Sequence, residues 1–206
     1  MKRFRSVIIF IVELFLLFGV AYVAVKVVHQ FIFQPFYVVG SSMEPNFFDH
    51  DYLIIEKIKY RFKSPERGEV IVTRTPSNPS SLIIKRVIGL PGEKVMIKNG
   101  KVFLKGEVLS SSALSSLPKG LSKDDQSSQE FELKEPYLPV GSETPGEMET
   151  FLKENEYFVM GDHRNMSLDS RSFGPVEKEL IVGHTWLRAW PISSFGLIKA
   201  QEVRPQ

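Results

Sequence analysis

An apolar run near the N-terminus, residues 6–25, constrains this chain more than any other feature. It contains fourteen Val, Ile, Leu or Phe residues and a single charged residue, Glu13. Twenty helical residues rise about 30 Å, which is the thickness of the hydrocarbon core of a bilayer. The large apolar side chains contribute roughly −4 to −8 kcal/mol to insertion, against about +3 kcal/mol for one carboxylate. The sequence therefore predicts a single membrane-spanning helix.

The flanking charges predict how this helix is oriented. Three basic residues, at positions 2, 3 and 5, precede the apolar run. Positive charges remain on the cytoplasmic side, so we expect residues 1–5 to be cytoplasmic, residues 6–28 to form the anchor and residues 29–206 to lie outside. A removable signal peptide is the alternative, because residues 19–21 resemble a small-x-small cleavage site. Apolar residues continue to position 33, which favours the anchor.

Charge and cysteine content exclude several functions. Beyond residue 13 the chain holds 23 basic and 23 acidic residues, so this part is formally neutral and lacks the basic surface of a nucleic-acid-binding protein. The absence of cysteine excludes disulfides and thiol catalysis. The four histidines are scattered, and no nucleotide-binding glycine motif occurs. We therefore predict no nucleic-acid partner, no metal and no cofactor.

Short strands dominate the pattern beyond residue 50, and the predicted fold class is mainly β, a β-rich domain behind the N-terminal transmembrane helix. Asn99-Gly100 between two alternating runs predicts a hairpin with a type I′ turn. The segment from about residue 106 to 155 carries eight serines between residues 110 and 128 and few large apolar residues before Phe131, which indicates a small inserted cap or loop region. A lobe that influences substrate choice is the alternative. Strands are expected over residues 52–58, 69–74, 81–88, 94–98, 101–105, 157–160 and 181–190.

Ser42 follows Val38 and Val39, which we expect to form a short apolar strand, and lies in a turn between a glycine and a proline. A serine hydroxyl works as a nucleophile where the backbone presents it sharply and N–H groups receive the oxyanion. Gly40 permits such a turn and a close approach of substrate, and Pro45 fixes the backbone just downstream. An ordinary Ser-rich turn is the alternative reading of this stretch.

Lys85 lies inside an apolar strand and is a candidate base for Ser42. Strand alternation places it on one face with Ile83 and Val87, while Arg86 points the other way. Its pKa must fall by about 2–3 units for the amine to act as a base near neutrality, which apolar neighbours can achieve by desolvation. The alternative is a solvated lysine on an edge strand.

The segment 160–176 is rich in hydroxyls, paired charges and glycines. Its Ser167, Asp169 and Arg171 are able to lock a base in place by hydrogen bonds. The alternative is a surface loop that Asx-type turns and an Asp–Arg pair stabilise.

Together these segments resemble the type I signal peptidases, membrane-anchored serine proteases with a Ser–Lys dyad. The resemblance covers nearly all of the chain except the Ser-rich insertion, and its blocks follow the order of the family behind an N-terminal anchor. The blocks are residues 42–45, 67–72, 85–93 and 161–174.

The resemblance implies a role for each matching residue. Ser42 would be the nucleophile, Lys85 the general base, and Ser167 a hydrogen-bond partner of the lysine amine, with Asp169 and Arg171 bracing the loop. The Ser42 N–H would face the oxyanion. Shallow pockets would accept small substrate residues at −1 and −3, lined by Phe36, Val38, Ile83 and Ile84. The expected substrates are exported preproteins with signal peptides, cut by a single-pass monomer at the outer face of a bacterial cytoplasmic membrane.

Several residues depart from the family pattern. Gly40 stands where one branch of the family has a serine that donates a second hydrogen bond to the oxyanion, and Asn46 replaces the usual threonine. His163 and Met166 replace asparagines. His163 also permits a Ser-His-Asp triad as an alternative to the Ser–Lys dyad, and Ser41 is the alternative nucleophile.

Three other functions remain open at this point. A processing protease with one narrow substrate, a self-cleaving protease like the SOS repressors, and an inactive membrane-tethered binding module are the alternatives. The anchor and the lack of a basic region argue against the self-cleaving regulator, and the presence of both Ser42 and Lys85 argues against the binding module.

Overall fold

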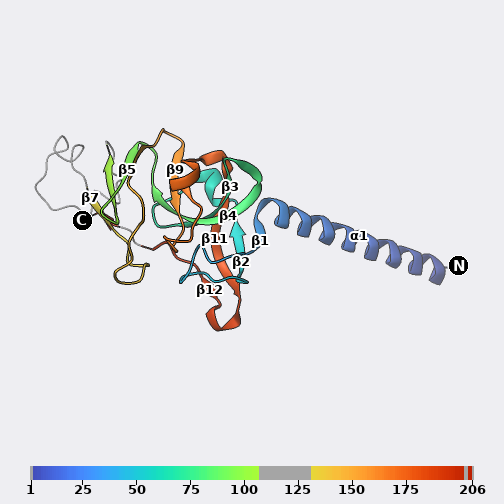
Figure 1. The fold of residues 1–206 in the computed structure, drawn as a ribbon. Coiled ribbons are helices and arrows are strands. Elements are labelled where there is room, and N and C mark those ends of the chain that lie inside the picture. The colour runs from blue at the N-terminus through green and yellow to red at the C-terminus, as the bar shows by residue number, and fades with distance from the viewer. Residues whose placement is uncertain (1, 107–130, 202–203, 206) are drawn as a thin grey trace, which may run out of the picture.

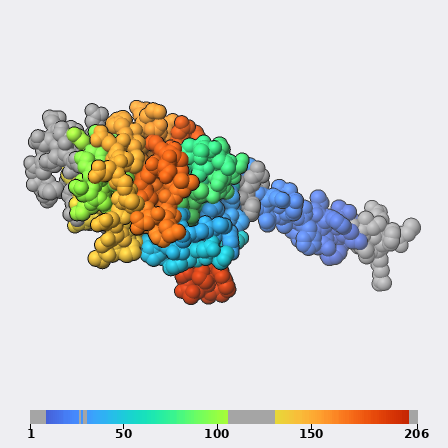
Figure 2. Space-filling view, in the orientation of Figure 1, coloured from blue at the N-terminus to red at the C-terminus, as the bar shows by residue number. Residues whose placement is uncertain are grey.

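A long N-terminal helix and a β-rich body make up the part of the chain that the structure, a computed structural model, describes: residues 2–106, 131–201 and 204–205. Helix α1 (Lys2–Phe31) projects away from the body (Figures 1 and 2). Its segment Ile9–Lys26 has a mean hydropathy of 2.2, and none of it is buried against the rest of the chain. The helix is therefore long and apolar enough to cross a membrane. The boundaries 1–5, 6–28 and 29–206 stay predictions.

The larger of two sheets has eight strands in the order β1-β2-β11-β3-β4-β9-β10, with β12 beside β11. β3 is buried except at Arg74, and β4 is exposed over residues 78–80 but fully buried over residues 84–89. These strands are β1 (Phe33–Tyr37), β2 (Tyr52–Glu56), β3 (Val70–Thr75), β4 (Asn78–Gly89), β9 (Glu156–Met160), β10 (Val176–Glu177), β11 (Ile181–Trp190) and β12 (Gly196–Leu197).

The second sheet has five strands in the order β13-β7-β6-β5-β8 and lies at the end of the body away from α1 (Figure 1). Its β5–β6 hairpin turns at Asn99 and Gly100 with φ of 50° and 74°, so the predicted turn with two positive φ angles is confirmed. The strands are β5 (Glu93–Lys98), β6 (Lys101–Gly106), β7 (Phe131–Lys134), β8 (Met148–Phe151) and β13 (Arg204–Pro205).

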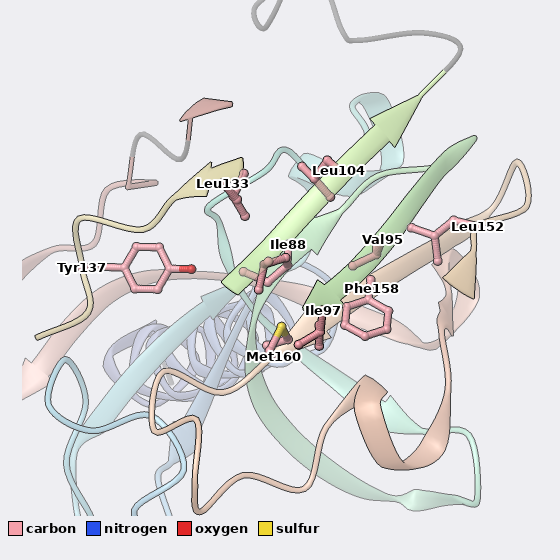
Figure 3. Packing of buried hydrophobic residues seen from close by; sticks show 10 residues of the cluster. Ile88, Val95, Ile97, Leu104, Leu133, Tyr137, Leu152, Phe158 and Met160 are labelled. Carbon is pink, nitrogen blue, oxygen red and sulfur yellow. The ribbon is translucent and has the colours of Figure 1, made fainter. Parts of the chain in front are cut away.

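Side chains from both sheets share one apolar core. In Figure 3, Ile88 of β4 and Phe158 and Met160 of β9 point toward Val95 and Ile97 of β5. This packing fixes the second sheet against the ends of β4 and β9. Short helices complete the body: α2 (Lys59–Phe62), α5 (Ser170–Phe173), η1 (Lys178–Leu180) and η2 (Ile192–Ser194).

The mainly β fold behind an N-terminal apolar helix is confirmed, and all seven expected strands are present with ends shifted by at most three residues. The expected insertion is more regular than its sequence indicates. Its Ser-rich part, residues 110–128, lies outside the described residues. Its later part contributes β7 and β8, which pair with β6 and β5 and bury Phe131 and Leu133.

Candidate active site

The turn that carries Ser42 follows β1 and is fixed by apolar anchors. Gly40 has a φ of 87°, a conformation that a residue with a Cβ rarely adopts, so the chain bends sharply just before Ser42. Val38 before this bend and Met43 and Phe47 after it are buried together in one core cluster. Ser42 itself is half-buried. The bend therefore presents the hydroxyl while its flanking residues pack inward.

Lys85 reaches Ser42 from the middle of β4. Its Nζ lies 2.8 Å from Ser42 Oγ and donates a second hydrogen bond to the Ile84 carbonyl at 2.9 Å. The lysine is only 3% exposed. The structure thus brings together the two residues that the sequence indicates as nucleophile and base.

Burial lowers the pKa of Lys85 to about 8. Desolvation disfavours the charged amine, and this effect outweighs the attraction of the nearby carboxylates of Asp169 and Asp162. Arg171 lowers the pKa further. A substantial fraction of the lysine is therefore neutral near pH 8 and able to accept the proton of a hydroxyl at hydrogen-bond distance.

The backbone around Ser42 offers one clear donor for an oxyanion. Within the described residues no acceptor receives a hydrogen bond from the Ser42 N–H. The Gly40 N–H, in contrast, donates to Asp49 Oδ1 at 2.8 Å. Because Gly40 also lacks a hydroxyl, it supplies no second donor to this site.

The loop after β9 lies against the Ser42 turn, and Gly161 is the point of contact. A Cβ at Gly161 would overlap the Ser42 carbonyl oxygen and the Ser167 side chain. The Gly161 N–H donates to Asp169 Oδ2 at 3.0 Å. Only a glycine allows this close approach of the two segments.

Asp169 and Arg171 form an ion pair within this loop. The Arg171 side chain donates to both carboxylate oxygens of Asp169, at 2.8 and 2.9 Å, and Asp169 caps α5. Burial alone would raise the pKa of Asp169, but the hydrogen bonds from Arg171 and the Gly161 N–H hold it below its ordinary value. Asp169 is therefore a fixed anion beside Lys85.

Ser167 lies in this loop with its Oγ buried. Its hydroxyl contributes to the lowered pKa of Asp169, yet it makes no hydrogen bond of ordinary geometry within the described residues. No hydrogen bond joins Ser167 to Lys85, so its supporting role stays a prediction.

Arg86 anchors the same loop from the other face of β4. It donates to both oxygens of Asp162, at 2.8 and 2.6 Å, and to the Gly68 carbonyl at 2.9 Å. Asn46 also donates to Asp162, at 2.9 Å. The asparagine that departs from the family pattern therefore completes this buried ion pair.

His163 does not form a triad with Ser42 in this arrangement. Its Nδ1 lies 3.2 Å from the Ser41 carbonyl oxygen, and its backbone N–H donates to the Ser42 carbonyl at 3.1 Å. The two carboxylates that would complete a triad, Asp162 and Asp169, bind Arg86 and Arg171 instead. The structure thus favours the dyad over the triad.

The predicted substrate-binding residues differ in exposure. Val38 and Ile84 are buried in the core cluster beneath the Ser42 turn, and Phe36 packs against that cluster. Ile83 is half-buried and lies two residues before Lys85, on the same face of β4. Their contact with substrate stays a prediction.

Sequence reasoning missed the residues that tie the second sheet to the site. Arg164 follows His163 in the loop and binds Glu135, Tyr137 and Thr144, which come from the expected insertion. Nothing in the sequence signals these contacts, because the partners lie 20 or more residues apart and the insertion reads as a loop. Among the described residues, no cluster of His, Cys, Asp or Glu could hold a metal ion.

Comparison with known proteins decides the family. Residues 11–190 match the model of a family described as signal peptidase, peptidase S26. The chain belongs to this S26 signal peptidase family. It is 33% identical over 190 residues to a probable signal peptidase I-2 of Synechocystis sp., which covers 87% of this chain and 76% of that protein. It is 31% identical over 185 residues to signal peptidase IB of Staphylococcus aureus, which covers 90% of this chain and 92% of that protein.

A solved signal peptidase I of Enterococcus faecalis V583 is 33% identical in sequence, and the match covers 59% of this chain and 97% of that one. Its TM-score is 0.36, which is too low to bear on the arrangement of the fold. The resemblance to signal peptidases is confirmed by the family match, and the chain is a serine endopeptidase, a hydrolase of the signal peptidase I type.

Proposed function

We propose that this S26 peptidase removes signal peptides from exported preproteins with Ser42 as nucleophile and Lys85 as general base. The single observation that carries this proposal is the distance of 2.8 Å between Lys85 Nζ and Ser42 Oγ, made by a lysine that is buried and therefore easily deprotonated. The family membership supports signal peptide removal, and this geometry supports the assignment of the two roles.

The reaction follows from the positions of the two side chains. Neutral Lys85 takes the proton of Ser42 Oγ as the oxygen attacks the scissile carbonyl. The Ser42 N–H donates to the resulting oxyanion. The ammonium of Lys85 then gives its proton to the departing amine, which leaves the signal peptide as an ester on Ser42. Lys85 next activates a water that hydrolyses this ester.

Specificity and location complete the proposal. Ile83 and Phe36 would flank the site that accepts small residues at −1 and −3, with Val38 and Ile84 buried in the core cluster beneath it. Helix α1 would hold the body on the outer face of a bacterial cytoplasmic membrane, with residues 1–5 in the cytoplasm. The peptidase would act as a monomer on preproteins emerging from the bilayer.

The test is cleavage of an exported preprotein with an Ala-x-Ala site by the detergent-purified full chain, with product ends read by mass spectrometry. We expect one cut after the second alanine, and loss of that cut when the −1 alanine becomes phenylalanine. Cleavage elsewhere, or equal cleavage of the phenylalanine substrate, would contradict the proposed specificity. No cleavage of any preprotein by folded protein would favour a narrow-substrate protease.

A further inference from the structure

A connection between two strands of the second sheet binds residues that flank the candidate active site. Residues 135–144, here called the strap, follow β7 and lead back toward β8. Tyr137 of the strap belongs to the core cluster that joins the sheets (Figure 3), and Thr144 at its end is buried. The strap is thus attached firmly to the second sheet at both ends.

The strap encloses the guanidinium of Arg164. Arg164 Nη1 donates to Glu135 Oε2 at 2.9 Å and to Thr144 Oγ1 at 2.7 Å, and Nη2 donates to the Tyr137 hydroxyl at 3.1 Å and to the other Glu135 oxygen. Arg164 is only 3% exposed. A buried guanidinium with four such acceptors has little freedom to move.

Arg164 in turn holds the loop that packs on the nucleophile. Its Nε donates to the Gly161 carbonyl at 3.0 Å. Gly161 is the residue whose N–H binds Asp169 and whose Cα lies against the Ser42 carbonyl. A shift of Arg164 would therefore move the contact between the loop and the Ser42 turn.

A second link from the strap reaches the Ser42 turn directly. Asn46 Nδ2 donates to the Tyr137 carbonyl at 2.9 Å as well as to Asp162. The guanidinium of Arg86 lies 4.0 Å from the centre of the Tyr137 ring. Tyr137 thus contacts the Ser42 turn through Asn46, and the loop after β9 through Arg164.

We propose that the strap is a positioning element of the catalytic site, because it holds the Ser42 turn and the loop after β9 in register through Asn46 and Arg164. None of the strap residues touches the dyad, so their effect passes through these two side chains. The proposal rests on the assignment of Ser42 and Lys85 as the dyad. The hydrogen bonds of the strap go to Asn46 and Arg164 and not to the proposed substrate-binding residues Phe36 and Ile83. Loosening the strap should therefore lower kcat and leave KM unchanged.

The experiment uses two substitutions of Thr144, one that removes its hydroxyl and one that keeps it. Thr144→Val keeps the shape but removes one acceptor of Arg164, and Thr144→Ser retains that acceptor. We expect kcat for preprotein cleavage to fall about fivefold to tenfold in the valine variant and to return to within about twofold of wild type in the serine variant. The kcat of Glu135→Gln should fall by at least about tenfold. The matched control is Glu132→Gln, which removes an ion pair with Lys101 on the same sheet and should leave kcat unchanged.

Hydrogen exchange of the same proteins gives a readout that does not need activity. Thr144→Val and Glu135→Gln should speed exchange of peptides covering residues 161–170 and leave β3 and β4 unchanged. The proposal is overturned if exchange there matches the control, or if exchange rises while kcat stays at the wild-type value. If the wild type cleaves no preprotein, the assigned function fails, and the exchange data alone then decide whether the strap holds the loop.

Discussion

Lys85 and Arg86 are neighbours on β4, and their side chains point to opposite faces of the sheet. Lys85 points to Ser42, and Arg86 points to Asp162 at the start of the loop after β9. Because strand residues alternate between faces, one strand positions both the proposed base and the anchor of the loop after β9. A shift of one residue in the register of β4 would exchange the two and destroy the site.

The pH dependence of cleavage should follow the titration of Lys85. Only the neutral amine acts as a base, and burial lowers its pKa to about 8. We expect kcat/KM to rise with pH up to about 8 and to fall about tenfold per unit well below that value. A pH–rate profile between pH 5 and 10 checks this. A plateau that extends down to pH 6.5 would point to a histidine base instead.

Removing the Lys85 amine should stabilise the fold while it abolishes activity. The pKa is about 8 in the folded state and 10.5 in the reference state. The unfolded state therefore binds more protons between these values, so wild-type stability rises with pH from about 8 to 10.5. Below pH 8 the burial costs up to about 3 kcal/mol.

Lys85→Met should accordingly unfold at a higher urea concentration than wild type at pH 6, and the difference should shrink toward pH 10.5. Lys153→Met is the control, because the Lys153 side chain is 81% exposed and should leave the midpoint unchanged. If Lys85→Met is less stable than wild type at pH 6, burial of the Lys85 charge does not destabilise the fold.

Gly161→Ala should impair catalysis more than stability. The added methyl group overlaps the Ser42 carbonyl oxygen and the Ser167 side chain, so the nucleophile must move relative to Lys85. We expect a fall in kcat of about 100-fold and a loss of about 1–3 kcal/mol in unfolding free energy. Gly196→Ala is the control, because nothing lies within 4 Å of its added Cβ. Near-normal kcat in Gly161→Ala would show that this contact does not align the site.

Asp162→Asn should destabilise the fold by leaving the buried Arg86 charge without its anionic partner. The pair is 2% and 0% exposed, and breaking such a pair costs about 3–5 kcal/mol. Urea unfolding measures this free energy, and the double variant Arg86→Met with Asp162→Leu should lose less of it than Asp162→Asn. Glu156 forms an ion pair with the exposed Lys153, so Glu156→Gln should lower the unfolding free energy by less than about 1 kcal/mol. Equal losses of unfolding free energy in Asp162→Asn and Glu156→Gln would contradict the special role of the buried pair.

The sequence predicts the central strands well because each carries a strong local signal. β4 carries apolar residues on both sides of Lys85 and Arg86, and Asn99-Gly100 permits the positive φ angles of a tight hairpin. The apolar stretch before Ser42 forms a strand only as far as Tyr37, and Val38 follows it as irregular chain. Pro35 argues against a strand at this point of the sequence. The structure tolerates the proline because β1 lies at the edge of the sheet.

The supporting contacts of the site could not be predicted from the sequence. Glu135 and Thr144 read as ordinary polar loop residues, and only folding brings them to Arg164. Asn46 likewise gave no signal of its contact with Asp162, which lies 116 residues away. Local pattern and the family blocks both mark Ser42 and Lys85 in the sequence, whereas the distance between them is visible only in the structure.

The most direct test of the account compares kcat/KM for Ser42→Ala, Lys85→Ala and the variant with both substitutions, with His163→Ala beside them. Residues that act as one unit are not additive, so we predict that each single variant loses at least about 10⁴-fold and the double variant loses no more than either. His163→Ala should lose less than about tenfold, because its N–H contact with Ser42 comes from the backbone. Substantial activity in Lys85→Ala, or a loss in His163→Ala that matches Ser42→Ala, would contradict the Ser–Lys dyad.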